Sequence, residues 1–141
     1  MNAEQQGLFE NACASLEAAR ATVEKGLYDD TASRAYYAMF HLARLFLLEH
    51  GLIFSKHRSV LAAFGQHFAK TGLIPAHFHR YLLDAQDKRL TGDYNAMLRV
   101  PRAEALRLIQ QAEELLQLTE ERYPRPAAAP TPPTQPTDPA A

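Results

Sequence analysis

The segment KRLTGDYN, residues 88–95, brings a guanidinium, a carboxylate, a phenol and an amide within about two turns of a helix. Arginine binds phosphate through two parallel N–H groups, and a carboxylate or phenol beside it can orient the arginine or handle a proton. The pattern predicts a phosphate site with Arg89, Asp93 and Tyr94 as candidate catalytic residues and Lys88 as a further cation. The alternative is a helix C-terminus at which Lys88 and Arg89 only complement the helix dipole. Both interpretations remain open from the sequence.

A second polar group lies on the most apolar stretch of the chain, residues 33–49. Arg34, Tyr37, His41 and Arg44 share one side of a helix there, while the rest of the circumference is apolar or small. The stripe is either an ordinary solvated edge or a basic, aromatic strip that faces a cleft. No acid lies on it to neutralise the arginines. A helix this apolar must be the central helix of a bundle, contacted on several sides.

Helical periodicity predicts about four further helices around this one, over residues 3–25, 56–71, 75–91 and 101–119. Glycines that follow three of the helices favour the left-handed conformation of a helix end, at Gly26, Gly51 and Gly72. Asp29 and Asp30 are expected to cap the central helix and Ser55 the third. Residues 92–95, GDYN, indicate a break or turn. No stretch alternates with period two, so the fold class is an all-α, up-and-down bundle of about five helices.

The domain is expected to span residues 1–123. Seven of the nine prolines lie in residues 124–141, a Pro/Ala/Thr-rich tail that has no large apolar side chain and is expected to be disordered. Cys13 is the single cysteine, no apolar run approaches the ~18 residues of a membrane span, and the N-terminus lacks signal-peptide features. These observations indicate a cytoplasmic protein without membrane contact.

Neither a metal site nor a cofactor is expected. His77 and His79 point in opposite directions on a helix, no Glu-x-x-His pair is present, and the glycines form no phosphate loop. Charge is unevenly distributed, because residues 34–107 hold eleven Lys or Arg against five acids and also all six histidines. This asymmetry favours an anionic partner bound by the middle of the chain, or else basic inner helices that pack beside acidic outer ones.

Three motifs in order carry a family resemblance. SRAYYAMF at residues 33–40, Ser55-Lys56-His57 at the start of a helix, and Arg89 followed by Asp93-Tyr94 resemble the HEPN family, most closely its short stand-alone prokaryotic members, over residues 5–122. The resemblance implies a helical bundle that forms a homodimer with a polar cleft between the protomers. Many such proteins are metal-independent endoribonucleases, and many are paired with a minimal nucleotidyltransferase in toxin–antitoxin systems.

The ribonuclease signature of that family is Arg-x(4–6)-His, and this chain departs from it. Counting from Arg89, the histidine belongs at Tyr94, Asn95 or Ala96, and none of these is histidine. Asp93 or Tyr94 could take over its acid–base role, His57 could enter from another helix, or the chain could bind without cleaving. The resemblance thus implies a protein that binds RNA or a nucleotide and that, if it also cleaves, is a toxin-type endoribonuclease with a degenerate motif. The alternative is a non-catalytic scaffold for a nucleotidyltransferase. The candidate binding residues are Arg34, Tyr37, His41, Arg44, Lys56, His57 and Lys88.

Overall fold

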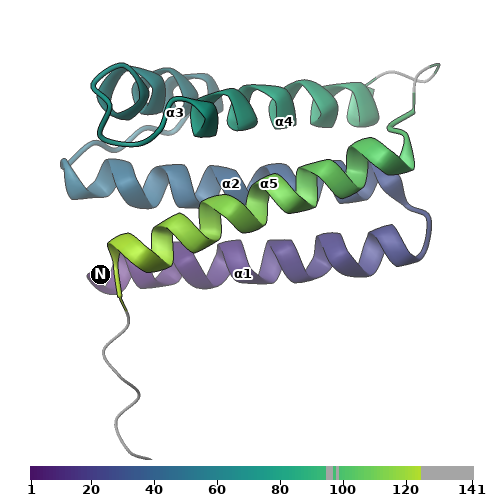
Figure 1. The fold of residues 1–141 in the computed structure, drawn as a ribbon, viewed down its shortest axis with the longest axis horizontal. Helices are drawn as coiled ribbons and strands as arrows, with labels where there is room; N and C mark the ends of the chain where they lie inside the picture. Colours follow the sequence, from purple (N-terminus) through teal and green to yellow (C-terminus); the bar gives the residue numbers. More distant parts are fainter. Residues whose placement is uncertain (95–96, 98, 125–141) are drawn as a thin grey trace, which may run out of the picture.

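Five α-helices and one π-helical turn make up the described part of the chain. The structure is a computed structural model that describes residues 1–94, 97 and 99–124. In chain order the elements are α1 (Ala3–Glu24), α2 (Tyr28–Glu49), α3 (His57–Phe64), the π-helix η1 (Gly65–Ala69), α4 (His77–Tyr94) and α5 (Arg102–Arg122) (Figure 1). No strand occurs among these residues. The prediction of an all-α bundle is therefore confirmed, whereas the predicted tail lies outside the described residues.

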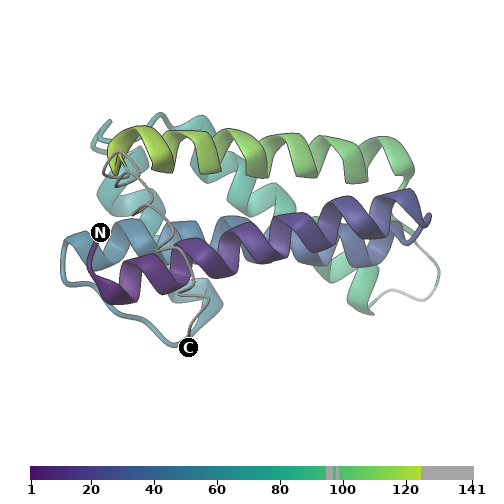
Figure 2. The same cartoon turned by 90° about the horizontal axis from the view of Figure 1, so that it is seen from below.

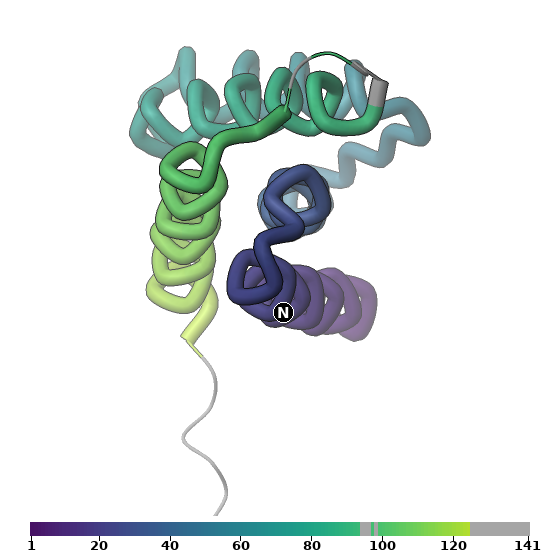
Figure 3. The backbone as a smooth tube through the Cα atoms, turned by 90° about the vertical axis from the view of Figure 1, so that its right-hand side faces the viewer, coloured from purple at the N-terminus to yellow at the C-terminus, as the bar shows by residue number. Residues whose placement is uncertain are grey.

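The helix α2 lies at the centre of the bundle. It contacts α1, α3, α4 and α5, and the end-on view shows it enclosed by α1 below, α3 and α4 above and α5 at the side (Figure 3). α5 runs alongside α1, to which the ion pair Arg20–Glu113 joins it at 3.2 Å (Figure 2). The central position predicted for residues 33–49 is confirmed.

The apolar side chains of α2 are buried within a single chain. The largest of them are at most 6% exposed: Tyr36, Met39, Phe40, Leu42, Leu45, Phe46 and Leu47. These side chains are buried without a second chain, while Tyr37 and Leu48 stay half-buried. Four helices around one are enough to cover it.

Among the described helices, none is both long and apolar enough to cross a membrane.

Two predicted caps are wrong. Leu27, not an aspartate, is the N-cap of α2, and it makes no side-chain capping bond. Asp29 lies in the first turn instead, where its carboxylate accepts a hydrogen bond from the Val100 backbone N–H at 2.9 Å and pairs with Arg99 at 3.2 Å. Likewise Lys56 rather than Ser55 precedes α3, again without a side-chain cap. Asp29 therefore binds the segment before α5 to the start of α2.

The break predicted for residues 92–95 begins later than Gly92, because α4 continues through Gly92 and Asp93 and ends at Tyr94. A Cβ at Gly92 would lie 3.1 Å from Cβ of Asp29. Glycine therefore lets the last turn of α4 approach the first turn of α2 closely, without interrupting the helix. The helix stops at Gly26, Gly51 and Gly72 are confirmed by positive φ angles of 74°, 69° and 79°.

The helix predicted for residues 56–71 is divided at Gly65, where α3 passes into η1. The Lys70 N–H bonds the Gly65 carbonyl oxygen, five residues back, at 2.9 Å. The His79 ring packs on Gly65, and its Nε2–H donates to the Leu61 carbonyl oxygen at 3.1 Å. A Cβ at Gly65 would lie 2.6 Å from that ring. The close contact between α3 and α4 therefore depends on this glycine.

We predict that Gly65→Ala destabilises the fold, because the added methyl group must displace the His79 ring and break its bond to Leu61. Overpacking of this kind costs about 1–3 kcal/mol. The matched control is Gly7→Ala within α1, where a Cβ meets nothing within 4 Å and alanine stabilises a helix by about 0.5–1 kcal/mol. Urea unfolding of both variants measures the difference. Equal stability of the two variants would contradict the importance of this contact.

Candidate functional site

The polar residues of interest meet where α2 packs against the start of α3 and the second half of α4. Tyr36, Tyr37 and Phe40 come from α2, His57 from the first residue of α3, and Arg89 and Asp93 from α4. We call these six residues the Arg89 cluster. The chain places residues 36, 57 and 89 in contact only because α3 and α4 both pack on α2.

Arg89 is held between two aromatic rings and a carboxylate. Its guanidinium carbon lies 5.1 Å from the ring centre of Tyr36 and 5.4 Å from that of Tyr37. Its Nε lies 3.3 Å from an oxygen of Asp93, one turn further along α4, although the geometry does not make a hydrogen bond. The Arg89 side chain is only 14% exposed. The alternative of a solvated arginine at a helix end is therefore wrong, since α4 continues and the side chain turns toward α2.

Tyr36 and His57 form the buried part of the cluster. The Tyr36 hydroxyl oxygen lies 3.0 Å from Nδ1 of His57, and the imidazole stacks on Phe40 with ring centres 4.2 Å apart. Tyr36 itself is 0% exposed. It was not a candidate from the sequence, because a tyrosine on an apolar helix is expected to be core. Its hydroxyl, which must find a partner when buried, was the one available signal.

The electrostatics of the cluster favour neutral aromatic groups beside a permanent cation. Burial raises the pKa of Tyr36 to about 12, and the charge of Arg89 opposes this rise. Burial lowers the pKa of His57, and the charges of Arg89 and Arg44 lower it further. The pKa of His41 is lowered by burial, by Arg44 and by His57. At neutral pH the phenol is thus protonated and both imidazoles are uncharged.

The structure brings some of the other candidates close to the cluster. The His41 ring lies 6.3 Å from that of Tyr37, and Arg44 is near enough to both His41 and His57 to lower their pKa. Arg34 and Lys56 are exposed, and Lys88 pairs with its neighbour Asp87 at 3.8 Å. Tyr94 is the last residue of α4, and its side chain lies outside the described part of the structure.

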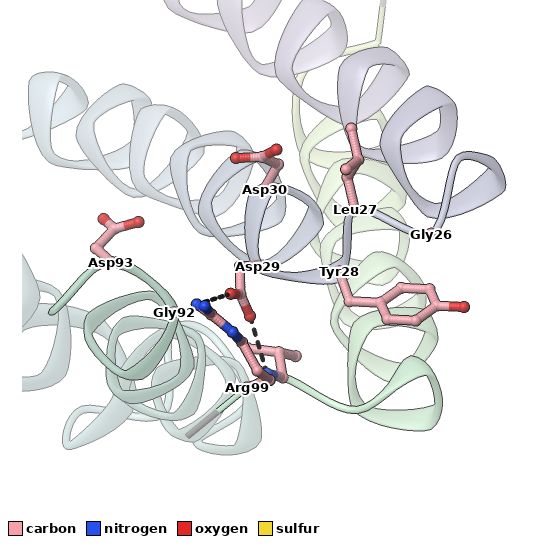
Figure 4. Close-up of a pocket in the computed structure, with 9 residues that line it drawn as sticks. Gly26, Leu27, Tyr28, Asp29, Asp30, Gly92, Asp93 and Arg99 are labelled. Atoms are coloured by element: carbon pink, nitrogen blue, oxygen red, sulfur yellow. Dashed lines mark hydrogen bonds and ion pairs between the residues drawn. The ribbon is translucent and has the colours of Figure 1, made fainter. Parts of the chain in front are cut away.

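Beside the cluster is a pocket of about 490 Å³, formed by the turn between α1 and α2 and by the end of α4. Its charged residues are Asp29, Asp30, Asp93 and Arg99, and Arg99 is directed at Asp29 (Figure 4). Three carboxylates against one paired guanidinium do not suit a phosphate. Within the described ranges, no group of three His, Cys, Asp or Glu side chains could hold a metal ion. The Arg89 cluster, in which the Asp93 carboxylate faces a guanidinium, is the better candidate for an anion site.

The fold and the site together define a class of protein. It is a small all-α bundle with a cationic, aromatic cluster where its central and fourth helices meet. The chain belongs to the HEPN family, because the family model described as HEPN domain matches residues 5–122. A UPF0332 protein of Gloeobacter violaceus is 40% identical over 122 residues, which cover 86% of this chain and 97% of that protein. A Methanocaldococcus jannaschii protein named "Putative toxin MJ0142" is 33% identical over 116 residues, or 82% and 79% of the two chains. The resemblance seen in the three sequence motifs is confirmed.

We predict that stability falls as the pH is lowered through the range below about 6.5, because His57 and His41 resist protonation in the folded chain. The unfolded chain binds these protons at its ordinary pKa, so the contribution is complete above that pKa and is lost as the pH falls through the lower, folded pKa. Urea unfolding at about pH 7.5 and about pH 5.5 measures the loss. His57→Gln should reduce it relative to the control His67→Gln on η1. An unchanged loss in His57→Gln would contradict the prediction.

Proposed function

We propose that this chain is a toxin-type HEPN protein that binds RNA or a nucleotide through phosphate contacts at the Arg89 cluster. The observation that carries the proposal is the fixed position of Arg89 between Tyr36 and Tyr37, with His57 beside it. A guanidinium held in one orientation is suited to two-pronged phosphate contact. The name "Putative toxin" of two similar proteins, which are 33% and 38% identical to this chain, supports the same class.

The surroundings of Arg89 fit a nucleotide better than a bare anion. Tyr37 is half-buried and keeps part of its ring accessible, which offers a stacking surface for a base. His41 and Arg44 continue the polar stripe along α2, and exposed Arg34 and Lys56 add positive charge near its course. Lys88, although paired with Asp87, contributes to the same field. Contacts of this kind bind a phosphate backbone with little sequence preference.

Cleavage is a separate step of the proposal. Asp93 is the carboxylate nearest Arg89, and its side chain is 35% exposed. Together with Tyr94 it is our candidate for the proton transfer that the absent histidine leaves open in a metal-independent endoribonuclease. The same absence supports the second candidate function, a non-catalytic partner of a minimal nucleotidyltransferase in the cytoplasm. Incubation with total RNA, with and without a chelator, separates cleavage from binding alone.

We predict that Arg89→Met weakens binding of a fluorescein-labelled single-stranded RNA by about tenfold or more. A hydrogen bond to a charged group contributes about 1.5–3 kcal/mol, and about 1.4 kcal/mol is a factor of ten. Methionine retains an apolar stem for packing on the tyrosines, so the variant should stay folded and lose about 1–2 kcal/mol of stability with the cation–π contacts. Arg89→Lys should recover little, because an ammonium lacks the planar fork. Fluorescence anisotropy measures each affinity.

The control for the loss of charge is Arg20→Met. It also removes one guanidinium, but from the ion pair with Glu113 between α1 and α5. It should bind RNA like the wild type, and circular dichroism should show that both variants are helical. Binding by Arg89→Met at the strength of the control would contradict the proposal. Unfolding of Arg89→Met would show instead that Arg89 serves the fold.

We further predict a homodimer, with a face of α4 as the contact. Leu83 and Leu90, seven residues apart on one side of α4, are 46% and 42% exposed, and they line a groove of about 420 Å³ against α3. Burial of such side chains contributes about 1.5–3 kcal/mol each. Light scattering at tens of micromolar should give twice the 15.8 kDa of one chain, and Leu83→Glu with Leu90→Glu should give one chain. A wild-type monomer at that concentration would rule the dimer out.

A further inference from the structure

The bond between Tyr36 and His57 allows two arrangements of its proton. Either the phenol donates to Nδ1 of His57 and the imidazole carries its own proton on Nε2, or Nδ1–H donates to the phenol oxygen. The two arrangements give His57 opposite chemistry toward a ligand. In the first, Nε2 is a hydrogen-bond donor, and in the second it is a free base.

Arg89 decides between the arrangements. Its guanidinium lies 5.1 Å from the Tyr36 ring centre, and its charge stabilises negative charge on the phenol oxygen. An arginine has N–H donors only, so toward Arg89 the phenol oxygen can act only as an acceptor. The phenol proton is then free to point at the other neighbour, Nδ1 of His57. A cation beside the phenol also makes the hydroxyl a stronger donor.

The surroundings of the imidazole favour the same arrangement. The cations that face His57 are Arg44 from α2 and Arg89 from α4, and His41 lies beside them. Asp93, the acid nearest this group, is engaged with Arg89 at 3.3 Å. An imidazolium would add a third positive charge beside Arg44 and Arg89. His57 is therefore neutral with Nδ1 as an acceptor.

We propose that Tyr36 is a positioning residue that holds His57 as the neutral tautomer with its proton on Nε2, so that His57 donates a hydrogen bond to a phosphate oxygen and is not a base. Among the described residues Nε2 has no protein partner, and it is not a buried atom. It therefore keeps some contact with solvent. The tautomer rests on the Tyr36–His57 contact and on the position of the Arg89 cation, and its action on a phosphate rests on the proposed function.

The ligand class that follows is a phosphate mono- or diester bound by donors from three helices. His57 supplies one directed N–H from α3, Arg89 supplies a fork from α4, and Arg44 supplies charge from α2. A neutral donor keeps its proton over the whole range above its lowered pKa. The contact from His57 should thus be independent of pH from about 7 to about 9. If the chain cleaves RNA, the proton acceptor is not His57.

The tautomer is tested by two-dimensional 15N–1H NMR of the imidazole groups in the full chain at about pH 7.5. The expected result for His57 is a protonated Nε2 and an unprotonated Nδ1 that accepts a hydrogen bond. Tyr36→Phe keeps the ring beside Arg89 but removes the hydroxyl, so His57 should become a mixture of tautomers. A proton on Nδ1 in the wild type would overturn the proposal. So would an unchanged tautomer in Tyr36→Phe, because the Nε2–H form is also the more abundant one in free histidine.

The role in binding is tested with two replacements of His57 and the labelled single-stranded RNA. The amide nitrogen of glutamine can occupy the place of Nε2, whereas asparagine reaches only the place of Nδ1. His57→Gln should therefore weaken binding several-fold less than His57→Asn, and the wild-type affinity should be constant from about pH 7 to about pH 9. Equal losses in the two variants would overturn His57 as a donor. If the wild type binds no RNA, the proposed function fails, while the NMR result still decides the tautomer.

Discussion

The structure depends on the need to cover most of the circumference of α2. Its apolar surface is too wide for one neighbour, and α1, α3, α4 and α5 all pack against it. Of its polar groups, Arg34 stays exposed, whereas the buried hydroxyl of Tyr36 requires a partner. Tyr36 finds one in His57 from α3, and the rings of Tyr36 and Tyr37 receive Arg89 from α4. The candidate site is in this sense a consequence of how the core is closed.

Arg89 shows how the cost of burying a cation is offset. Removing a guanidinium from water is expensive unless it is paired, and its Nε lacks a well-aligned hydrogen bond among the described residues. Two aromatic faces and the Asp93 carboxylate compensate in part. The close approach of Gly92 to Asp29 holds this turn of α4 in position.

The chain belongs to the HEPN family but has no histidine at residues 94–96. Its other histidines therefore matter most for the site. Residues 94–96, where the resemblance would place an acid–base histidine, are tyrosine, asparagine and alanine, whereas His57, whose pKa is lowered, enters the cluster from α3. A donor such as His57 stabilises bound phosphate without exchanging protons with it. Under the proposed function, binding is therefore a less demanding role for this cluster than cleavage, in which Asp93 or Tyr94 would have to handle the proton.

The sequence alone determined the fold class, the central place of residues 33–49 and the glycine stops, because helical periodicity and backbone freedom are local properties. It also identified Arg89, Asp93, Tyr37 and His57 as candidates from their chemistry. It could not find Tyr36, since whether a tyrosine on an apolar helix is a core ring or a hydrogen-bonding partner depends on a residue 21 positions away. It misread Gly92 as a break and Asp29 as a cap, because both are explained by a contact between α4, α2 and the start of α5. Only the tertiary structure decided that Arg89 turns inward, since burial is set by the helices that pack around a side chain and not by its neighbours in sequence.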